Sequence, residues 1–337
     1  MVNIREEIER KEERLLSPYA ALSVRSKGRV QEESEDLLRP VFQRDRDRII
    51  HSKAFRRLKD KTQVFLTPEG DHYRTRLTHT LEVAQIARTV SRSLNLNEDL
   101  TEAIALAHDL GHTPFGHAGE RALNRVCPLG FRHAEQSVRV VQLLERDGRG
   151  LNLTYEVLDG IRNHGMKMKP ETLEGQVVRL SDKIAYMHHD LDDAVRAGIL
   201  PDDRVPEHIA RVAGNTLGER LDTFITDMIR ESYGTGEVRL SAPVFAALMD
   251  LRQWMFENVY TNKTAKSQEG KAEKLVETLY AFFTENPDEM PEEYIFLIEE
   301  KGEKKERIVS DYISSMTDRY AIGLYEDMYI PYPWTLK

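Results

Sequence analysis

Hydrophobic residues recur at helical spacing over much of the chain. In one stretch they fall every three or four positions, at Val83, Ala87, Val90 and Leu94. This spacing places side chains on one face of an α-helix, and His79, four residues before Val83, shares that face. A second apolar pattern runs from Leu173 to Ala197, with Asp182 on the stripe beside it. The pattern therefore predicts two buried helices that each carry a polar residue on or near the inward side.

A further helix is predicted to begin at Asn97, a residue that caps helices well. Acidic residues follow it in the first turn, where they favour the helix dipole. We expect this helix to end near Gly111, with the glycine in the left-handed conformation common at helix ends. His108 and Asp109 would then lie at the C-terminal end of a buried helix.

Strand signals are weak. Two short runs, Thr62 to Leu66 and Glu237 to Leu240, are candidates for one small hairpin, but no alternation of apolar and polar residues persists. The fold class is therefore predicted to be all-α, with at most a small β-hairpin.

The composition is that of a globular protein. The chain has 337 residues, of which 40% are hydrophobic and 31% charged, and a net charge of −9. No window reaches the roughly 18 apolar residues of a membrane span. The first residues lack the apolar core of a signal peptide, and the single cysteine, Cys127, cannot form an internal disulfide. These features lead us to expect a cytoplasmic protein with no membrane partner.

Cationic residues gather between Arg39 and Lys61, against only three aspartates. The segment contains nine of them: Arg39, Arg44, Arg46, Arg48, Lys53, Arg56, Arg57, Lys59 and Lys61. One interpretation is an anion site, with phosphate as the obvious ligand. The other is a solvated helix face whose arginines pair with Asp45, Asp47 and more distant acids. The sequence favours neither of these two interpretations over the other.

The segment ALAHDLGHTPFGHAGE, from Ala105 to Glu120, holds three of the eleven histidines. A lone histidine on an apolar face is usually a hydrogen-bonded core residue. A buried carboxylate such as Asp182, however, is costly unless it is paired or bound to a cation. The candidate metal ligands are His79, His108, Asp109 and Asp182. Two neutral imidazoles and two carboxylates balance a divalent ion, and their mixed donors suit Mn, Fe, Co, Ni or Zn, and Mg less well.

The order of these ligands, a histidine, a His-Asp pair and a later aspartate, resembles the HD superfamily of metal-dependent phosphohydrolases. Four longer segments are similar to the deoxyguanosine triphosphate triphosphohydrolase family. They are FQRDRDRIIHSKAFRRLKDKTQVF (Phe42 to Phe65), RTRLTHTLEVAQIAR (Arg74 to Arg88), AHDLGHTPFGHAGE (Ala107 to Glu120) and DYISSMTDRYA (Asp311 to Ala321). The resemblance extends in order over roughly residues 40 to 325. It implies an HD-domain helical core at 40–210, an N-terminal helical segment at 1–39 and a helical C-terminal region at 211–337 packed on the core.

The resemblance also implies a reaction. A metal-bound water or hydroxide would attack the α-phosphorus of a deoxynucleoside triphosphate, releasing the deoxynucleoside and inorganic triphosphate. His117 corresponds to the catalytic histidine and Glu120 to the acid that orients it. They are three residues apart and share a face if that segment is helical. The alternative for Glu120 is a purely structural role at a helix start.

Seven further positions are implied to bind substrate: Gln63, Arg76, His112, His133, Lys183, Tyr186 and Asp190. Arg76, Lys183 and the two histidines would meet phosphate. Tyr186 would pack on the deoxyribose, and Asp190 would hold its 3′-hydroxyl. Gln63 would approach the sugar or base edge. Ordinary helix-surface pairing is the alternative for each contact.

Some features stay open. The sequence leaves His72, His188 and His189 without a role, at the surface or at the edge of the site. It does not decide whether Asp311, Asp318 and Arg319 bind phosphate, bind a neighbouring subunit or fix the last helix. The resemblance implies a homo-oligomer, a tetramer or hexamer, and leaves room for a nucleotide effector or single-stranded DNA. An HD nucleotidase or phosphodiesterase, and a non-enzymatic nucleotide- or nucleic-acid-binding scaffold, are the competing functions.

Overall fold

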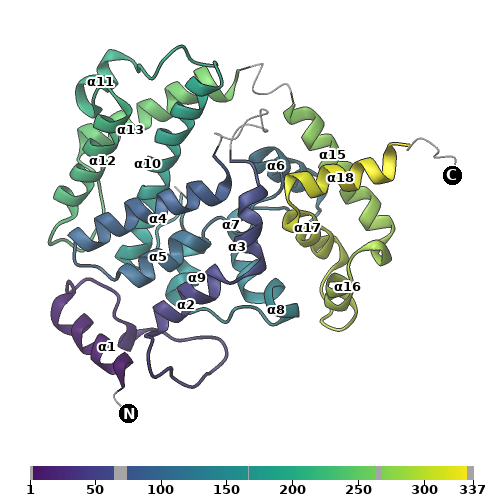
Figure 1. The fold of residues 1–337 in the computed structure, drawn as a ribbon, viewed down its shortest axis with the longest axis horizontal. Coiled ribbons are helices and arrows are strands. Elements are labelled where there is room, and N and C mark those ends of the chain that lie inside the picture. The colour runs from purple at the N-terminus through teal and green to yellow at the C-terminus, as the bar shows by residue number, and fades with distance from the viewer. Residues whose placement is uncertain (1–2, 64–73, 166, 263–267, 332–337) are drawn as a thin grey trace, which may run out of the picture.

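The computed structural model describes residues 3–63, 74–165, 167–262 and 268–331, which form a bundle of helices joined by loops (Figure 1). No named strand occurs among these residues, and the β-pairing consists of two isolated bridges, Arg29 with Thr154 and Thr62 with Thr75. The predicted all-α class is confirmed. The hairpin prediction is wrong for its second half. The second run, Glu237 to Leu240, forms no strand, and Val238 N donates to the side-chain oxygen Oε1 of Gln176. The first run ends at Leu66, which lies outside the described residues.

Helices from the first two hundred or so residues build most of one large apolar cluster. Its main helices are α2 (Val41–Ile50), α4 (Arg76–Ser93), α5 (Glu98–Ala107), α9 (Tyr155–Arg162) and α10 (Leu173–Arg196). The predicted apolar stripes of α4 and α10 face this cluster. α1 (Ile4–Leu15), η1 (Ser23–Arg25), α3 (Lys53–Arg57) and η2 (Leu58–Asp60) lie at its edge. We call this the larger cluster.

Helix α5 begins as predicted but ends earlier. The Asn97 side chain accepts a hydrogen bond from Leu100 N, whereas the last α-helical residue is Ala107 and His108 is the C-cap. Gly111 does not have a positive φ, so the predicted left-handed stop is wrong. A Cβ at this position would lie 2.2 Å from Ser137 N. Glycine is needed here because the backbone of α7 (His133–Arg139) approaches so closely.

The second half of the chain adds two groups of helices. α11 (Glu207–Ala213), α12 (Leu217–Ser232), α13 (Ala242–Met255) and the π-helical turn η4 (Phe256–Tyr260) extend the larger cluster. α15 (Glu269–Glu285), η5 (Pro287–Glu289), α16 (Glu292–Glu299), α17 (Lys305–Ser315) and α18 (Asp318–Tyr329) form a separate group on the right of Figure 1. The latter group encloses a smaller apolar cluster that includes Val276, Phe283 and Ile313.

One helix from the middle of the chain belongs to this smaller cluster. Ala118, Ala122 and Leu123 of α6 (Gly116–Val126) pack there, against the C-terminal helices. The chain then continues through α7, the π-helical turn η3 (Val140–Leu144) and the short α8 (Glu145–Gly148). Helices on either side of α6 in the sequence therefore pack with the larger cluster, while α6 itself faces the C-terminal region.

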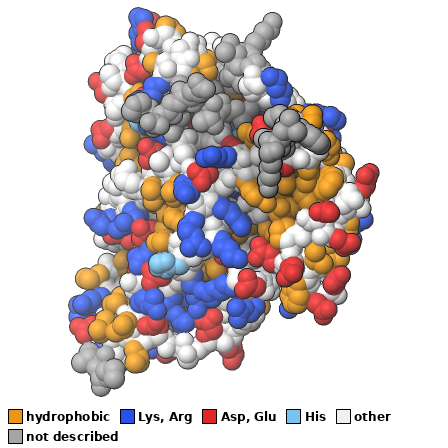
Figure 2. All heavy atoms as spheres, turned by 45° about the vertical axis from the view of Figure 1, so that its right-hand side comes forward, with side chains coloured by type: hydrophobic (Ala, Val, Ile, Leu, Met, Phe, Trp, Pro, Cys, Tyr) orange, Lys and Arg blue, Asp and Glu red, His pale blue; other side chains and the backbone are white. Residues whose placement is uncertain are grey.

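The cationic segment at Arg39–Lys61 is largely neutralised at its N-terminal end. Arg39 pairs with Asp36 and Asp47, and Arg44 and Arg48 both pair with Glu33. This is the paired helix face of the second interpretation. Lys and Arg side chains also gather on the face shown in Figure 2, beside an area of hydrophobic side chains. Among the described helices, none combines the length and apolarity needed to cross a bilayer.

Candidate active site

Three helices bring the predicted metal ligands together. His79 comes from α4, His108 and Asp109 from the end of α5, and Asp182 from α10. One ligand atom from each of His79, His108 and Asp109 lies within 4.8 Å of the others. Asp182 Oδ1 lies 3.3 Å from His79 Nε2 and 3.8 Å from His108 Nε2. Four residues spread over about a hundred positions of sequence thus converge at one point.

The donor atoms are oriented as a cation requires. His108 Nδ1 lies 2.7 Å from Ala105 O, which makes it the protonated nitrogen. Nε2 therefore carries a lone pair, is buried, and has no hydrogen-bond partner. Such a fixed tautomer is usual for metal-binding histidines. An orphaned imidazole nitrogen facing two carboxylates fits a divalent ion.

Both carboxylates are held in their ionised form. Burial by itself would raise the pKa of Asp109, yet the neighbouring His108, His112 and Arg76 hold it well below its usual range. Burial likewise opposes ionisation of Asp182, but Lys183 and a hydrogen bond from His79 keep the pKa of that carboxyl well below its usual range. Burial lowers the pKa of His79, which favours the neutral ligand form.

A second group of polar residues lies beside these ligands. His117 Nδ1 is 3.0 Å from Glu120 Oε2, as the predicted helical spacing requires. His133 Nδ1 lies 2.9 Å from the other oxygen of the same carboxylate. Although burial acts against it, hydrogen bonds from these two imidazoles lower the pKa of Glu120. Glu120 is therefore an anion that holds two rings in place.

His164 is a member of the site that sequence reasoning missed. Its Nε2 lies 3.3 Å from His133 Nε2, and its ring centroid is 5.2 Å from that of His108. Nδ1 is 2.6 Å from Ile161 O, three residues back, just as His108 bonds to Ala105. The signal was present, because His164 comes three residues after Ile161, the last apolar residue of α9, just beyond the end of that helix. Burial, assisted by the charges of His108 and His133, lowers the pKa of His164 to about 4.

These residues surround a cavity of about 280 Å³. Of the predicted substrate contacts, six line it: Gln63, Arg76, His112, His133, Lys183 and Tyr186. Arg76 is already engaged, since its Nη1 donates to Asp109 Oδ2 at 2.6 Å. His112 Nε2 lies 3.3 Å from Asp109 Oδ1, and its ring stacks on His133 with centroids 4.0 Å apart. The cavity wall is thus rich in nitrogen donors, which suits an anionic ligand.

Asp190 does not line this cavity. It is fully buried, and its Oδ2 accepts a hydrogen bond from the Tyr260 hydroxyl. Tyr260 in turn stacks on Tyr186, with centroids 5.6 Å apart. Burial raises the pKa of Asp190 well above its usual range. Arg252, from α13, also lines the cavity, and neither it nor Tyr260 was identifiable from the sequence.

The unassigned histidines have different surroundings. His189 is buried, with Nε2 2.9 Å from Glu82 Oε2 and its ring against that of His79. It therefore lies at the edge of the site and not at the surface. His188 is partly buried, and His72 lies outside the described residues.

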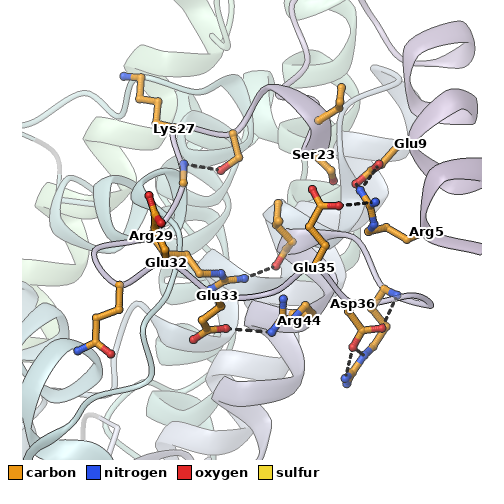
Figure 3. Close-up of a pocket in the computed structure, with 16 residues that line it drawn as sticks. Arg5, Glu9, Ser23, Lys27, Arg29, Glu32, Glu33, Glu35, Asp36 and Arg44 are labelled. Carbon is orange, nitrogen blue, oxygen red and sulfur yellow. Dashed lines mark hydrogen bonds and ion pairs between the residues drawn. The ribbon is translucent and has the colours of Figure 1, made fainter. Parts of the chain in front are cut away.

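A larger cavity, of about 490 Å³, lies far from these groups between α1 and the segment before α2. Figure 3 shows that its charged side chains point toward one another. Arg5 pairs with Glu9 and Glu35, and Arg44 with Glu33. Size alone would favour this cavity, but most of its charged side chains already form ion pairs. The smaller cavity is the better candidate because its donors converge without being fully paired.

Two family models match the chain, one of them over the segment that carries most of these residues. Residues 76–187, from α4 into α10, match the HD domain family, and residues 238–327 match the phosphohydrolase-associated domain family. A phosphohydrolase from Bacteroides thetaiotaomicron shares the fold, with a TM-score of 0.53, 18% identity, and coverage of 83% of this chain and 67% of its own. The fold and site thus define an HD-domain protein of the hydrolase class.

Relatives of higher sequence identity show which family of HD-domain proteins the chain belongs to. A deoxyguanosinetriphosphate triphosphohydrolase-like protein from Caldanaerobacter subterraneus subsp. tengcongensis is 57% identical, over 99% of this chain and 98% of its own. One from Desulfatibacillum aliphaticivorans is 47% identical, over 98% and 99% of the two chains. The chain belongs to the deoxyguanosinetriphosphate triphosphohydrolase-like family of HD-domain proteins, as its motifs predict.

Proposed function

We propose that this protein hydrolyses deoxynucleoside triphosphates to deoxynucleosides and inorganic triphosphate, with a divalent metal ion as cofactor. The observation that carries this proposal is the pairing of His117 with Glu120 at 3.0 Å, on the wall of the cavity that the metal-donor set also faces. One half of the site can bind a cation and the other can deliver a proton. Attack at an α-phosphorus with a sugar oxygen as leaving group requires both.

His79, His108, Asp109 and Asp182 would hold the ion. When bound, a divalent ion supplies a Lewis acid that activates water and offsets phosphate charge. The mixed nitrogen and oxygen donors suit Mn, Fe, Co, Ni or Zn, and Mg less well. Lys183 Nζ lies 3.2 Å from Asp182 Oδ2 and would orient that carboxylate while reaching toward phosphate.

The proton would come from His117. The bond between the α-phosphorus and the 5′-oxygen breaks as water adds to phosphorus, and the departing oxygen needs a proton. Glu120 accepts the hydrogen bond from Nδ1 and orients the ring, so that the proton would be donated from Nε2. The side chain of His117 is 57% exposed, which allows it to recover a proton from solvent. His117 thus serves as general acid and Glu120 as its orienting anion.

The remaining wall residues would bind the substrate. Arg76, His112 and His133 offer donors to the phosphates, together with Lys183. Tyr186 would pack on the deoxyribose and oppose a 2′-hydroxyl. Gln63 has a buried Oε1 without a partner among the described residues and would approach the sugar or base edge. Asp190 is fully buried and does not line the cavity, so it would reach the 3′-hydroxyl only if the side chains that cover it moved.

Product analysis tests the proposal. Purified protein would be incubated with each dNTP and NTP in the presence of Mg, Mn, Co or Ni, and the phosphates separated by ion exchange. We expect inorganic triphosphate and a deoxynucleoside from at least one dNTP, and little turnover of ribonucleotides. Release of only monophosphate or pyrophosphate would indicate another HD hydrolase, and binding without turnover a scaffold. Light scattering in the same buffers would test the expected tetramer or hexamer.

A further inference from the structure

Asp318, at the start of α18, reaches out of its own helix into the loops beside the cavity. Its Oδ1 accepts a hydrogen bond from Phe115 N at 2.9 Å. Its Oδ2 accepts from Thr62 N at 3.0 Å and also from the Thr62 hydroxyl. Only 8% of Asp318 is exposed. One buried carboxylate therefore joins the residue before Gln63 to the turn before His117.

The turn before His117 needs such support. Phe115 has φ +62° and Gly116 has φ +54°, two successive residues in the left-handed region. For phenylalanine this conformation costs energy and persists only where neighbours enforce it. Phe115 is the N-cap of α6, yet α6 has no side-chain cap of its own. Asp318 supplies from a distant helix the acceptor that the local sequence lacks.

Lys61 fixes the other end of the same loop. It is 2% exposed, and its Nζ donates to His112 O at 2.5 Å and to Ser314 O at 2.6 Å. Ser314 lies in the last turn of α17, three residues after Asp311. The C-terminal region thus holds the loop from His112 to Gly116 at both ends.

A role in fixing α18 alone does not explain Asp318. Thr317 already caps that helix, because its side chain accepts from Tyr320 N at 3.2 Å. The Asp318 carboxylate makes its described hydrogen bonds to Thr62 and Phe115, both outside the helix. Thr317 therefore caps α18, whereas Asp318 bonds to the loops beside the cavity. Substitutions at these two neighbouring residues can be compared as a matched pair.

We propose that Asp318 is a positioning residue, which sets the direction of His117 through the Phe115 turn and the place of Gln63 through Thr62. The C-terminal region, by this inference, completes the active site instead of only covering the core. The effect on turnover rests on the proposed function, whereas the effect on the loop does not.

The test compares Asp318→Ala and Asp318→Asn with Thr317→Ala. Amide hydrogen exchange of Phe115 and His117 would be followed in the metal-free full chain, and kcat and KM measured in the loaded enzyme. We expect Asp318→Ala to speed exchange of the Phe115 amide by about tenfold or more, because that amide loses its acceptor. Its kcat should fall by roughly tenfold to a hundredfold through misplacement of His117.

Asp318→Asn keeps one acceptor oxygen and should lie between Asp318→Ala and the wild type in both measurements. Thr317→Ala should loosen the first turn of α18 while leaving Phe115 exchange and kcat close to wild type. Equal behaviour of Asp318→Ala and Thr317→Ala would overturn the proposal, since the carboxylate would then serve only the helix. If exchange changes as expected but the wild type releases no triphosphate, the positioning role stands and the proposed function fails.

Discussion

The two halves of the candidate site differ in packing and in exposure. The metal-donor set sits on α4, α5 and α10, in the larger cluster, and His108 has no exposed surface. The His117–Glu120 pair sits on α6, which packs in the smaller cluster, and His117 is open to solvent. A buried neutral imidazole is a good ligand but a poor carrier of protons. An exposed imidazole beside an anion can bind and release a proton during each turnover.

Under the proposed function, this difference separates metal binding from proton transfer. The ligands depend on contacts within one cluster, so their geometry is set by the helices that carry them. The His117–Glu120 pair depends on the packing of α6 against α15 within the smaller cluster, and on the contacts that Asp318 and Lys61 make with the loop before it. Substitutions in the two halves should therefore impair different properties, metal binding in one half and proton transfer in the other. Four variants test that distinction.

The largest effect is expected from Asp182→Ala. The variant removes one of the two carboxylates that balance a divalent ion, so the metal should be lost. Activity should fall by roughly a thousandfold or more, as expected when Lewis-acid stabilisation of several kcal/mol disappears. Elemental analysis after dialysis measures the metal, with the exposed Asp222→Ala as control. Full metal content in Asp182→Ala would show that metal binding does not depend on Asp182, and would contradict the role given to the buried half of the site.

His117→Ala should give the complementary result. The metal ligands are untouched, so metal content should equal that of the wild type. Turnover should fall by about 10²–10⁴-fold, the usual contribution of a general acid. The same two assays apply, with the exposed His208→Ala as control. A variant that keeps full activity would remove His117 from the mechanism.

Arg139→Ala tests the contact between the regions. Arg139, at the end of α7, bonds through Nε to Asp311 Oδ2 at 2.7 Å, and Asp311 is fully buried in α17. Burial raises the pKa of Asp311 to about 6 even with the arginine beside it. Removal of the partner leaves a buried carboxylate and should cost about 3–5 kcal/mol in the free energy of unfolding. Urea titration measures this, and the exposed Arg132→Ala should change little.

Glu174→Gln concerns the larger cluster alone. Glu174 is fully buried in α10, accepts from Asn97 N and Ala21 N, and has one oxygen without a partner among the described residues. Burial raises its pKa from 4.5 to about 7. The folded state thus holds a proton that the unfolded state releases between these values, so stability falls as the pH rises from 4.5 through 7.

The shift in the pKa of Glu174 corresponds to roughly 3 kcal/mol at full ionisation. Glu174→Gln should therefore be more stable than the wild type at pH 8 by about 2–3 kcal/mol, and similar at pH 4. Thermal unfolding at both pH values checks this, with Glu13→Gln on the exposed face of α1 as control. A Tm difference that does not depend on pH would contradict the assignment. Metal content should be the same in wild type and variant.

Much of the metal-donor set could be predicted from local sequence patterns. His79 was placed by its spacing from Val83, and Asp182 by its position beside a long apolar stripe. Asn97 was recognised as a cap because its side chain competes for the first backbone amides. The same reasoning could have found His164, which follows an apolar stripe in the way His108 does. It failed at Gly111, because the demand for glycine comes from α7 and not from the helix that ends there.

The sequence by itself determined that the chain is helical, which side of each helix is buried, and which residues could ligate a cation. These properties follow from periodicity and from the cost of burying charge, which act over a few residues. Only the tertiary structure decided that α6 packs with the C-terminal helices and that Arg252 lines the cavity. It also decided that Tyr260 stacks on Tyr186, and that Asp318 accepts a hydrogen bond from Phe115 N two hundred residues away. Such contacts join surfaces that are each plausible alone, and no local pattern specifies which of them meet.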